Sequence, residues 1–145
     1  MSQKTAGVIL NGCGHRDGSE VHEAVFTLLA LDQHGIEANC YALEEDQKKV
    51  FDHINSSEQP ETRSMIVESA RIARGAIKPL SQCSVDQIDM LVIPGGSGGA
   101  FNLCNYAEAG SEMSVHAEIA TVITEVFSKK KKWPFWTKKK KEKKT

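Results

Sequence analysis

Residues 8–25 read VILNGCGHRDGSEVHEAV, an apolar run that passes through a glycine-rich loop into a helical pattern. The short apolar run at 6–10 is typical of a buried parallel strand. After the loop, apolar side chains recur at the spacing of one helix face, and Gly35 ends that pattern. The stretch therefore predicts a strand followed by a helix, with Asp17 or Ser19 as the residue that caps the helix.

The alternation of strands and helices continues along the chain. The predicted elements are strand 36–43, an irregular segment 44–60 with a turn of helix near 50–54, helix 61–74, strand 77–80, strand 89–94 and a final helix 115–127. Short connections between such elements favour an α/β fold, in which helices cover both faces of a parallel sheet. The glycine loops 12–18 and 95–99 both follow strands, so we expect them at the carboxyl edge of the sheet, where such folds bind ligands.

The distribution of charge divides the chain into two parts. Ten of the 18 basic residues lie within 129–144, so the first 128 residues hold 8 basic and 18 acidic side chains, a formal charge of −10. We expect one globular domain at 1–127, because 40% hydrophobic residues suit a packed core. The lysine-rich tail at 128–145 is low-complexity and self-repelling, and we expect it to be disordered. It is expected to bind polyanions without specificity, or to be a solvated extension with no partner.

Several classes of protein are not indicated. The four cysteines lie at irregular spacings and the five histidines share no metal-binding spacing, so we expect neither a zinc site nor a disulfide scaffold. The N-terminus resembles neither a signal peptide nor a transit peptide, and no apolar run reaches membrane-spanning length. These features favour reduced thiols and a cytoplasmic protein.

The residues that best fit chemistry follow the two glycine loops. Glu23 lies in the first turns of the first predicted helix, so its carboxylate should face loop 95–99, ionised by the positive helix end and able to act as a general acid/base. The alternative is a solvated surface carboxylate, with Glu20 as the residue for simple capping. Gly95 and Gly96 expose backbone N–H groups that suit an anion or a developing oxyanion, although a tight turn also requires glycine.

Loop 12–18 allows two other interpretations. Its backbone N–H groups could lower the pKa of Cys13 and make the thiol redox-active, or Cys13 could simply fill the end of a strand. The glycine spacing G-x-G-x-x-x-G is similar to a dinucleotide-binding loop, although it is one residue longer than the usual pattern. In that alternative, Glu44 or Glu45 would hold a ribose.

Three segments together resemble a known family. VILNGCGHRDGSEVHEAV (8–25), ETRSMIVESARIARGAIKPL (61–80) and LVIPGGSGGAFNLCNYAEAGSE (91–112) are similar to signature segments of the ElbB-type isoprenoid-biosynthesis-associated glyoxalases. This family belongs to the ThiJ/PfpI (class I glutamine amidotransferase-like) superfamily, and the resemblance covers residues 5–127. It implies a flavodoxin-like fold, a homodimer and a cofactor-free conversion of glyoxal or methylglyoxal into a hydroxy acid. A mitochondrial location is the alternative that it adds.

The resemblance also implies roles for individual residues. Glu23 matches the glutamate that transfers the proton, and Gly95 with Gly96 matches the backbone donors to the oxyanion. The nucleophilic cysteine of the family should follow the helix that ends near Phe127, but this chain continues as KKKKWPFWTKKKK and has no cysteine beyond Cys104. We therefore expect the fold to be incomplete at its C-terminus and the chain to be inactive. The alternative is a non-catalytic protein that binds a small anion or a partner and carries a basic tail.

Overall fold

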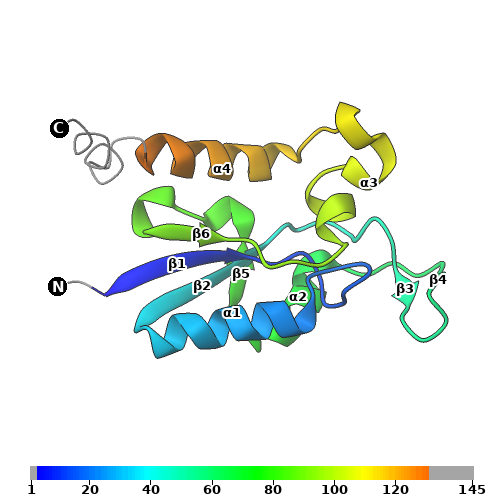
Figure 1. Cartoon of the computed structure of the whole chain (residues 1–145), viewed down its shortest axis with the longest axis horizontal. Coiled ribbons are helices and arrows are strands. Elements are labelled where there is room, and N and C mark those ends of the chain that lie inside the picture. The colour runs from blue at the N-terminus through cyan, green and yellow to red at the C-terminus, as the bar shows by residue number, and fades with distance from the viewer. Residues whose placement is uncertain (1–2, 131–145) are drawn as a thin grey trace, which may run out of the picture.

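The computed structural model describes residues 3–130, and a four-stranded parallel sheet forms its centre. The strands are β1 (Lys4–Ile9), β2 (Ile36–Ala42), β5 (Ile77–Pro79) and β6 (Met90–Val92), in the spatial order β5-β2-β1-β6 (Figure 1). The register places Ala6 of β1 between Ala38 of β2 and Met90 of β6. Each predicted strand is present, so the predicted α/β class with a flavodoxin-like parallel sheet is confirmed.

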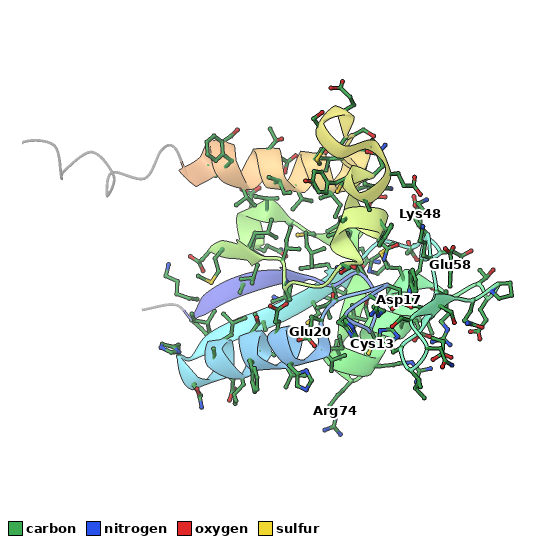
Figure 2. The ribbon with its side chains drawn as sticks, turned by 45° about the vertical axis from the view of Figure 1, so that its right-hand side comes forward. Cys13, Asp17, Glu20, Lys48, Glu58 and Arg74 are labelled. Carbon is green, nitrogen blue, oxygen red and sulfur yellow. The ribbon has the colours of Figure 1, made fainter. Side chains whose placement is uncertain are left out.

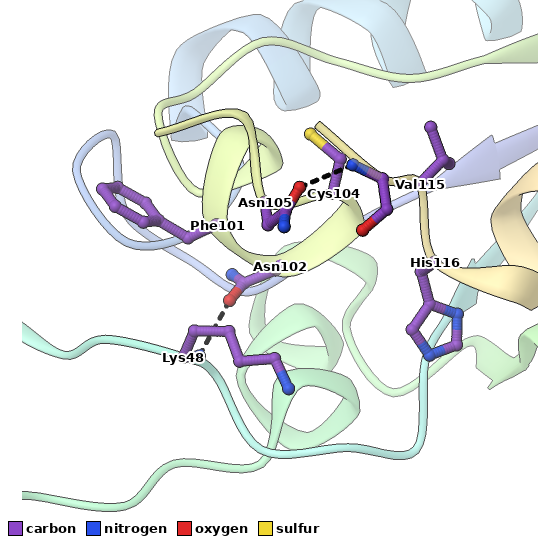
Figure 3. Close-up of a pocket in the computed structure, with 8 residues that line it drawn as sticks. Lys48, Phe101, Asn102, Cys104, Asn105, Val115 and His116 are labelled. Carbon is purple, nitrogen blue, oxygen red and sulfur yellow. Dashed lines mark hydrogen bonds between the residues drawn. The ribbon is translucent and has the colours of Figure 1, made fainter. Parts of the chain in front are cut away.

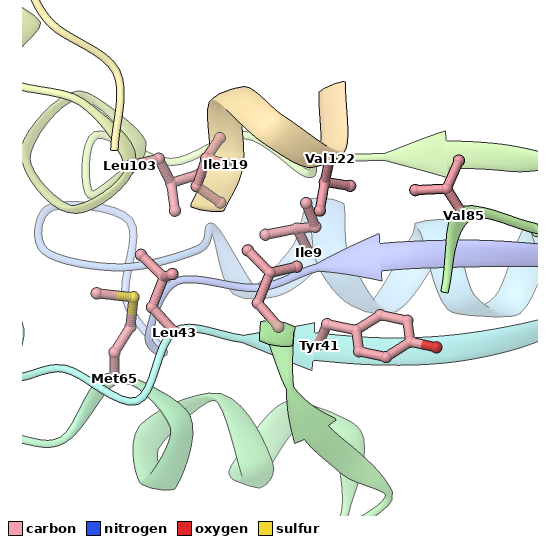
Figure 4. Close-up of a cluster of buried hydrophobic side chains, with 9 residues drawn as sticks. Ile9, Tyr41, Leu43, Met65, Val85, Leu103, Ile119 and Val122 are labelled. Carbon is pink, nitrogen blue, oxygen red and sulfur yellow. The ribbon is translucent and has the colours of Figure 1, made fainter. Parts of the chain in front are cut away.

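Helices cover both faces of this sheet, and side chains alternate along the strands between the two layers. Helices α1 (Val21–Gln33) and α2 (Met65–Ala73) cover one face, while α4 (Ala117–Lys130) lies across the other (Figure 1). On the α4 side, Ile9 of β1 joins Ile119 and Val122 of the helix in a buried cluster (Figure 4). On the α1 side, Val8 joins Ala24 in a second buried cluster.

Segment 44–60 differs from the prediction, because it holds a hairpin instead of a turn of helix. Strands β3 (Phe51–Asp52) and β4 (Ser57–Glu58) pair antiparallel with each other and form a separate two-stranded sheet. The remaining short elements lie between β5 and α4. They are the 3₁₀ turns η1 (Leu80–Gln82), η2 (Val85–Gln87) and η4 (Gly110–Glu112), the π-helical turn η3 (Gly99–Leu103) and the short helix α3 (Tyr106–Ala109).

The helix ends also differ from the prediction in three places. Glu20, and neither Asp17 nor Ser19, is the N-cap of α1, because its carboxylate accepts the N–H of Glu23 at 2.7 Å. Helix α2 begins at Met65 instead of residue 61, and α4 continues to Lys130, three residues beyond the predicted end. The predicted disorder of the tail from residue 131 onward lies outside the described residues.

Helix α1 leaves part of its apolar surface uncovered. Val25, Phe26 and Leu29 are 44%, 63% and 48% exposed, while Ala24 and Leu31 on the inner face are buried. Strand β6 pairs with β1 alone within residues 3–130, so its outer edge is unpaired there. Within residues 3–130, no helix has the length and apolar character needed to cross a membrane.

Candidate functional site

The two glycine loops contact each other at the carboxyl edge of the sheet, as their positions after β1 and β6 predict. The N–H of Gly98 donates to the carbonyl of Gly18 at 3.2 Å, and the N–H of Glu20 donates to the carbonyl of Gly95 at 2.7 Å. The loop that follows β6 is therefore held directly against the start of α1.

The close approach of the loops explains two of the glycines. Gly96 has φ +119°, and a β-carbon there would clash with the carbonyl oxygen of Gly18 and lie 2.5 Å from the backbone nitrogen of Glu20. A β-carbon on Gly98 would clash with the backbone of Gly18 in the same way. The glycine content of 95–99 had suggested close approach to a ligand. At these positions the chain needs glycine for contact with its own backbone.

Glu23 lies where its helix position predicts, beside Gly95. The two are so close that a β-carbon on Gly95 would overlap the Glu23 carboxylate, although the Glu23 side chain remains exposed. Among the described residues, the backbone N–H groups of Gly95 and Gly96 donate to no partner. The structure thus brings one carboxylate together with two available amide donors, which are the parts that proton transfer beside a developing oxyanion requires.

Glu20 holds the start of α1 in place but is not one of the groups that would transfer a proton. The hydrogen bond from the Glu23 N–H, and then the contact with His22, hold the pKa of the Glu20 carboxyl below its ordinary value. Figure 2 shows Glu20 at the start of α1, with Cys13 and Asp17 at the same end of the molecule. A capping role for Glu20 was predicted, but Glu20 is itself the N-cap of α1 and not the partner of a cap at Asp17.

Buried amide side chains connect the loops of this edge, and the sequence analysis missed them. Asn102, which is 2% exposed, donates from Nδ2 to the carbonyls of Asn11 and Asp17, both at 2.9 Å. Its Oδ1 accepts the N–H of Lys48 at 2.9 Å. One side chain from η3 therefore joins the first glycine loop to the segment before the hairpin. An asparagine in an apolar stretch, FNLC, was the only available signal for this role.

The geometry of loop 12–18 argues against a dinucleotide site. The N–H of Gly12 donates to the Ser69 hydroxyl at 2.8 Å, and that of Gly14 donates to the carbonyl of Ser19 at 2.9 Å. Donors engaged within the protein are not free to bind phosphate. Glu45, which was suggested as a ribose ligand, accepts a hydrogen bond from a histidine instead.

The four cysteines are free thiols, and the pKa of three of them, Cys13, Cys40 and Cys83, is raised above its ordinary value. Burial, and then Glu68, raise the pKa of Cys13, a direction opposite to the lowering that one of the two interpretations of this loop requires. Burial is also the largest cause of the raised pKa of Cys40 and of Cys83. Within residues 3–130 no three potential ligands gather into a metal site.

Comparison with known proteins identifies relatives of this chain. It is 39% identical to the mitochondrial ES1 protein homolog of Rattus norvegicus over 125 residues, which are 86% of this chain and 47% of the rat protein. It is also 39% identical over 119 residues to the human mitochondrial glutamine amidotransferase-like class 1 domain-containing protein 3, covering 81% of this chain and 44% of that protein. The chain thus spans about half the length of these relatives. No protein-family model matches it.

Solved structures agree with the sequence relatives. The crystal structure of an isoprenoid biosynthesis protein with an amidotransferase-like domain from Ehrlichia chaffeensis matches with a TM-score of 0.83 and 42% identity, over 87% of this chain and 60% of that one. A Francisella tularensis rapid encystment protein, 11% identical with a TM-score of 0.54 over 88% of this chain and 55% of its own, shares the fold alone. The chain is therefore homologous to the ES1 and class I glutamine amidotransferase-like proteins and has an ElbB-type, amidotransferase-like fold.

Proposed function

We propose that this homologue of the class I glutamine amidotransferase-like proteins carries the proton-transfer half of a site for small dicarbonyl compounds. The observation that supports this proposal is the exposed carboxylate of Glu23 beside the unengaged N–H groups of Gly95 and Gly96. These groups suit a small aldehyde or ketone, because amide N–H groups can donate to its oxygen and a neighbouring carboxylate can move a proton at the adjacent carbon.

The full reaction needs a thiolate in addition to these groups. The thiolate adds to the aldehyde carbon of methylglyoxal and forms a hemithioacetal. Glu23 then takes the proton from that carbon and returns it to the neighbouring carbonyl carbon, while the amides stabilise the negative oxygen. Water hydrolyses the resulting thioester, which releases the hydroxy acid and the thiol.

We propose further that the chain as written does not complete this reaction, because no cysteine stands after the helix that ends near Phe127, where the family resemblance places the nucleophile. No cysteine lies beyond Cys104 in the sequence. Cys13 interacts with Glu68 and Arg71 of α2, and its pKa is raised. The purified full-length chain should therefore form no lactate from methylglyoxal above the buffer control. Turnover that disappears in Cys13→Ala or Cys104→Ala would overturn this proposal.

A chimera tests the role of Glu23 directly. In it, the part of the Ehrlichia chaffeensis protein beyond the matched region follows Phe127 of this chain. If the chimera converts methylglyoxal, Glu23→Gln should lower its activity about 100-fold to 10,000-fold, the usual contribution of a general acid/base group. Glu20→Gln is the matched control, because it removes a neighbouring carboxylate but keeps an oxygen that can accept the Glu23 N–H. A chimera that is inactive from the start, or one that depends on Glu20 instead, would contradict the assignment.

We also propose a cellular location. The printed names of the rat and human relatives describe them as mitochondrial, which supports the mitochondrial alternative over the cytoplasmic one for this chain. Fractionation of cells that express the native gene tests this proposal.

A further inference from the structure

A separate cleft lies beside η3, and no part of the proposed reaction uses it. Its volume is about 180 Å³. Phe101 and Val115 supply apolar walls, while Lys48, Asn105 and Ser114 supply polar groups (Figure 3). A cleft of this size accommodates a small organic molecule with one polar end.

One side of the cleft is fixed by a histidine and a carboxylate. Nδ1 of His116 accepts the N–H of Glu118 at 3.3 Å, so the ring proton lies on Nε2, which donates to Oε1 of Glu45 at 2.8 Å. Oε2 of Glu45 lies 3.7 Å from Nζ of Lys48. The Glu45 carboxylate is thus held in place by His116. Its long ion pair with Lys48 leaves most of the N–H donors of the Lys48 ammonium available to a ligand.

Two further polar side chains of the cleft, Asn105 and Ser114, have donors without partners among residues 3–130. Oδ1 of Asn105 accepts the N–H of Ser114 at 2.6 Å, which directs the amide and leaves its NH₂ group without a partner in residues 3–130. The Ser114 hydroxyl forms no hydrogen bond with any described residue either. The cleft therefore presents an ammonium, an amide NH₂ and a hydroxyl around one space, and the neighbouring carboxylate of Glu45 is engaged by His116 and Lys48. Groups of this kind recognise an acceptor-rich anion.

We propose that this cleft is a second ligand site, which binds the carboxylate of a small aliphatic acid between Lys48, Asn105 and Ser114, with the alkyl part against Phe101 and Val115. The charge of the ligand offsets the ammonium, and its two oxygens satisfy the unpaired N–H and O–H donors. The apolar walls, Phe101 and the 43% exposed Val115, reduce the contact of the alkyl part with water. This site is independent of Glu23 and of the dicarbonyl chemistry.

Cys104 lines the same cleft and provides a built-in reporter. The native full-length protein is treated with iodoacetate, an anion, or with iodoacetamide, its neutral analogue, and each cysteine is quantified by mass spectrometry. We expect the ratio of the iodoacetate rate to the iodoacetamide rate to be at least about threefold higher at Cys104 than at Cys13 or Cys83, because each of those thiols faces a glutamate. Sodium butyrate should protect Cys104, and neutral butyramide should not.

Two variants assign the effect to the cleft. Lys48→Gln removes the ammonium, and Asn105→Asp keeps the acceptor for Ser114 while replacing the donor with a negative charge. Both should reduce the ratio at Cys104 to that of the other cysteines, whereas the control Lys78→Gln, at an exposed lysine in β5, should leave it unchanged.

A ratio at Cys104 that equals the others in the unmodified protein, or that survives both cleft variants, would overturn the proposal. If Cys104 reacts with neither reagent, amide NMR shifts decide the question. Butyrate should move the signals of Asn105, Val115 and His116 at concentrations where butyramide moves none, and the absence of such shifts would equally refute the site.

Discussion

Replacing Gly96 by alanine tests whether the contact between the two glycine loops is essential to the fold. The residue has φ +119°, a conformation that costs a side-chain-bearing residue about 1–3 kcal/mol. Its new β-carbon would also clash with the carbonyl oxygen of Gly18 and lie 2.5 Å from the Glu20 nitrogen, and both neighbours are backbone atoms that cannot rotate away. We expect a total loss of about 3 kcal/mol or more, which is at or above the upper end of the usual range for one substitution.

The matched control is Gly99→Ala, in the same loop. Gly99 has an ordinary φ, and nothing lies within 4 Å of the position that its β-carbon would take, so this variant should change the free energy of unfolding by less than about 1 kcal/mol. Urea unfolding of both full-length variants, followed by circular dichroism, compares them. If Gly96→Ala is as stable as Gly99→Ala, the inference that the loops meet at this distance is wrong.

Three further predictions concern the hydrogen bonds of Asn102, the hydrogen bond between His116 and Glu45, and the lysine-rich tail. Asn102→Ala should cost about 2–4 kcal/mol in urea unfolding, because it leaves two buried carbonyls and one N–H without their partner, whereas Asn55→Ala in the exposed hairpin should cost less than about 1 kcal/mol. The hydrogen bond from His116 lowers the pKa of Glu45 below its ordinary value of 4.5, so the stabilisation is present above that value and is lost as the pH falls through the lowered one. Glu45→Gln should therefore reduce the dependence of stability on pH in this acidic range, and an unchanged pH profile would refute the coupling. Residues 128–145 fused to an inert carrier should bind anionic vesicles at low salt and release most of them near physiological ionic strength, and binding that persists in high salt would contradict a purely electrostatic tail.

The sequence predicted the main layers of the fold because their signals are local. The apolar run of β1 and the 3.6-residue spacing of α1 each reflect a buried face, and a buried face is visible in a single stretch of sequence. The hairpin of β3 and β4 was missed for the opposite reason. Each strand has two residues, and the N–H of Phe51 is held by the side chain of Asp17, a residue 34 positions away. A segment that depends on distant partners carries little periodicity of its own.

The site was partly predictable for a similar reason. The position of Glu23 follows from the helix that carries it, and the position of Gly95 follows from the strand before it, so topology alone brings them to one edge. The helix cap and the hydrogen bonds of the buried amide side chains were not predictable in this way, because several nearby polar residues could form them. Asp17 was expected to cap α1, but it binds the hairpin instead, and Glu20 takes the cap. Only the three-dimensional arrangement decides between such candidates.

The chain has four thiols, so the proposed inactivity rests on the surroundings of these thiols and not on their number. Cys40 is buried in β2, and burial raises its pKa. Cys83 interacts with Tyr41, and Cys13 interacts with charged residues of α2. Cys104 is engaged with the carbonyl of Gly99 and lines the cleft beside η3. Under the proposed function, the thiolate that attacks a carbonyl at Gly95 comes from outside residues 3–130, either from a further segment or from a small thiol. Glutathione added to the purified chain with methylglyoxal separates these cases, since turnover that requires Glu23 would show that a free thiol can serve the retained half of the site.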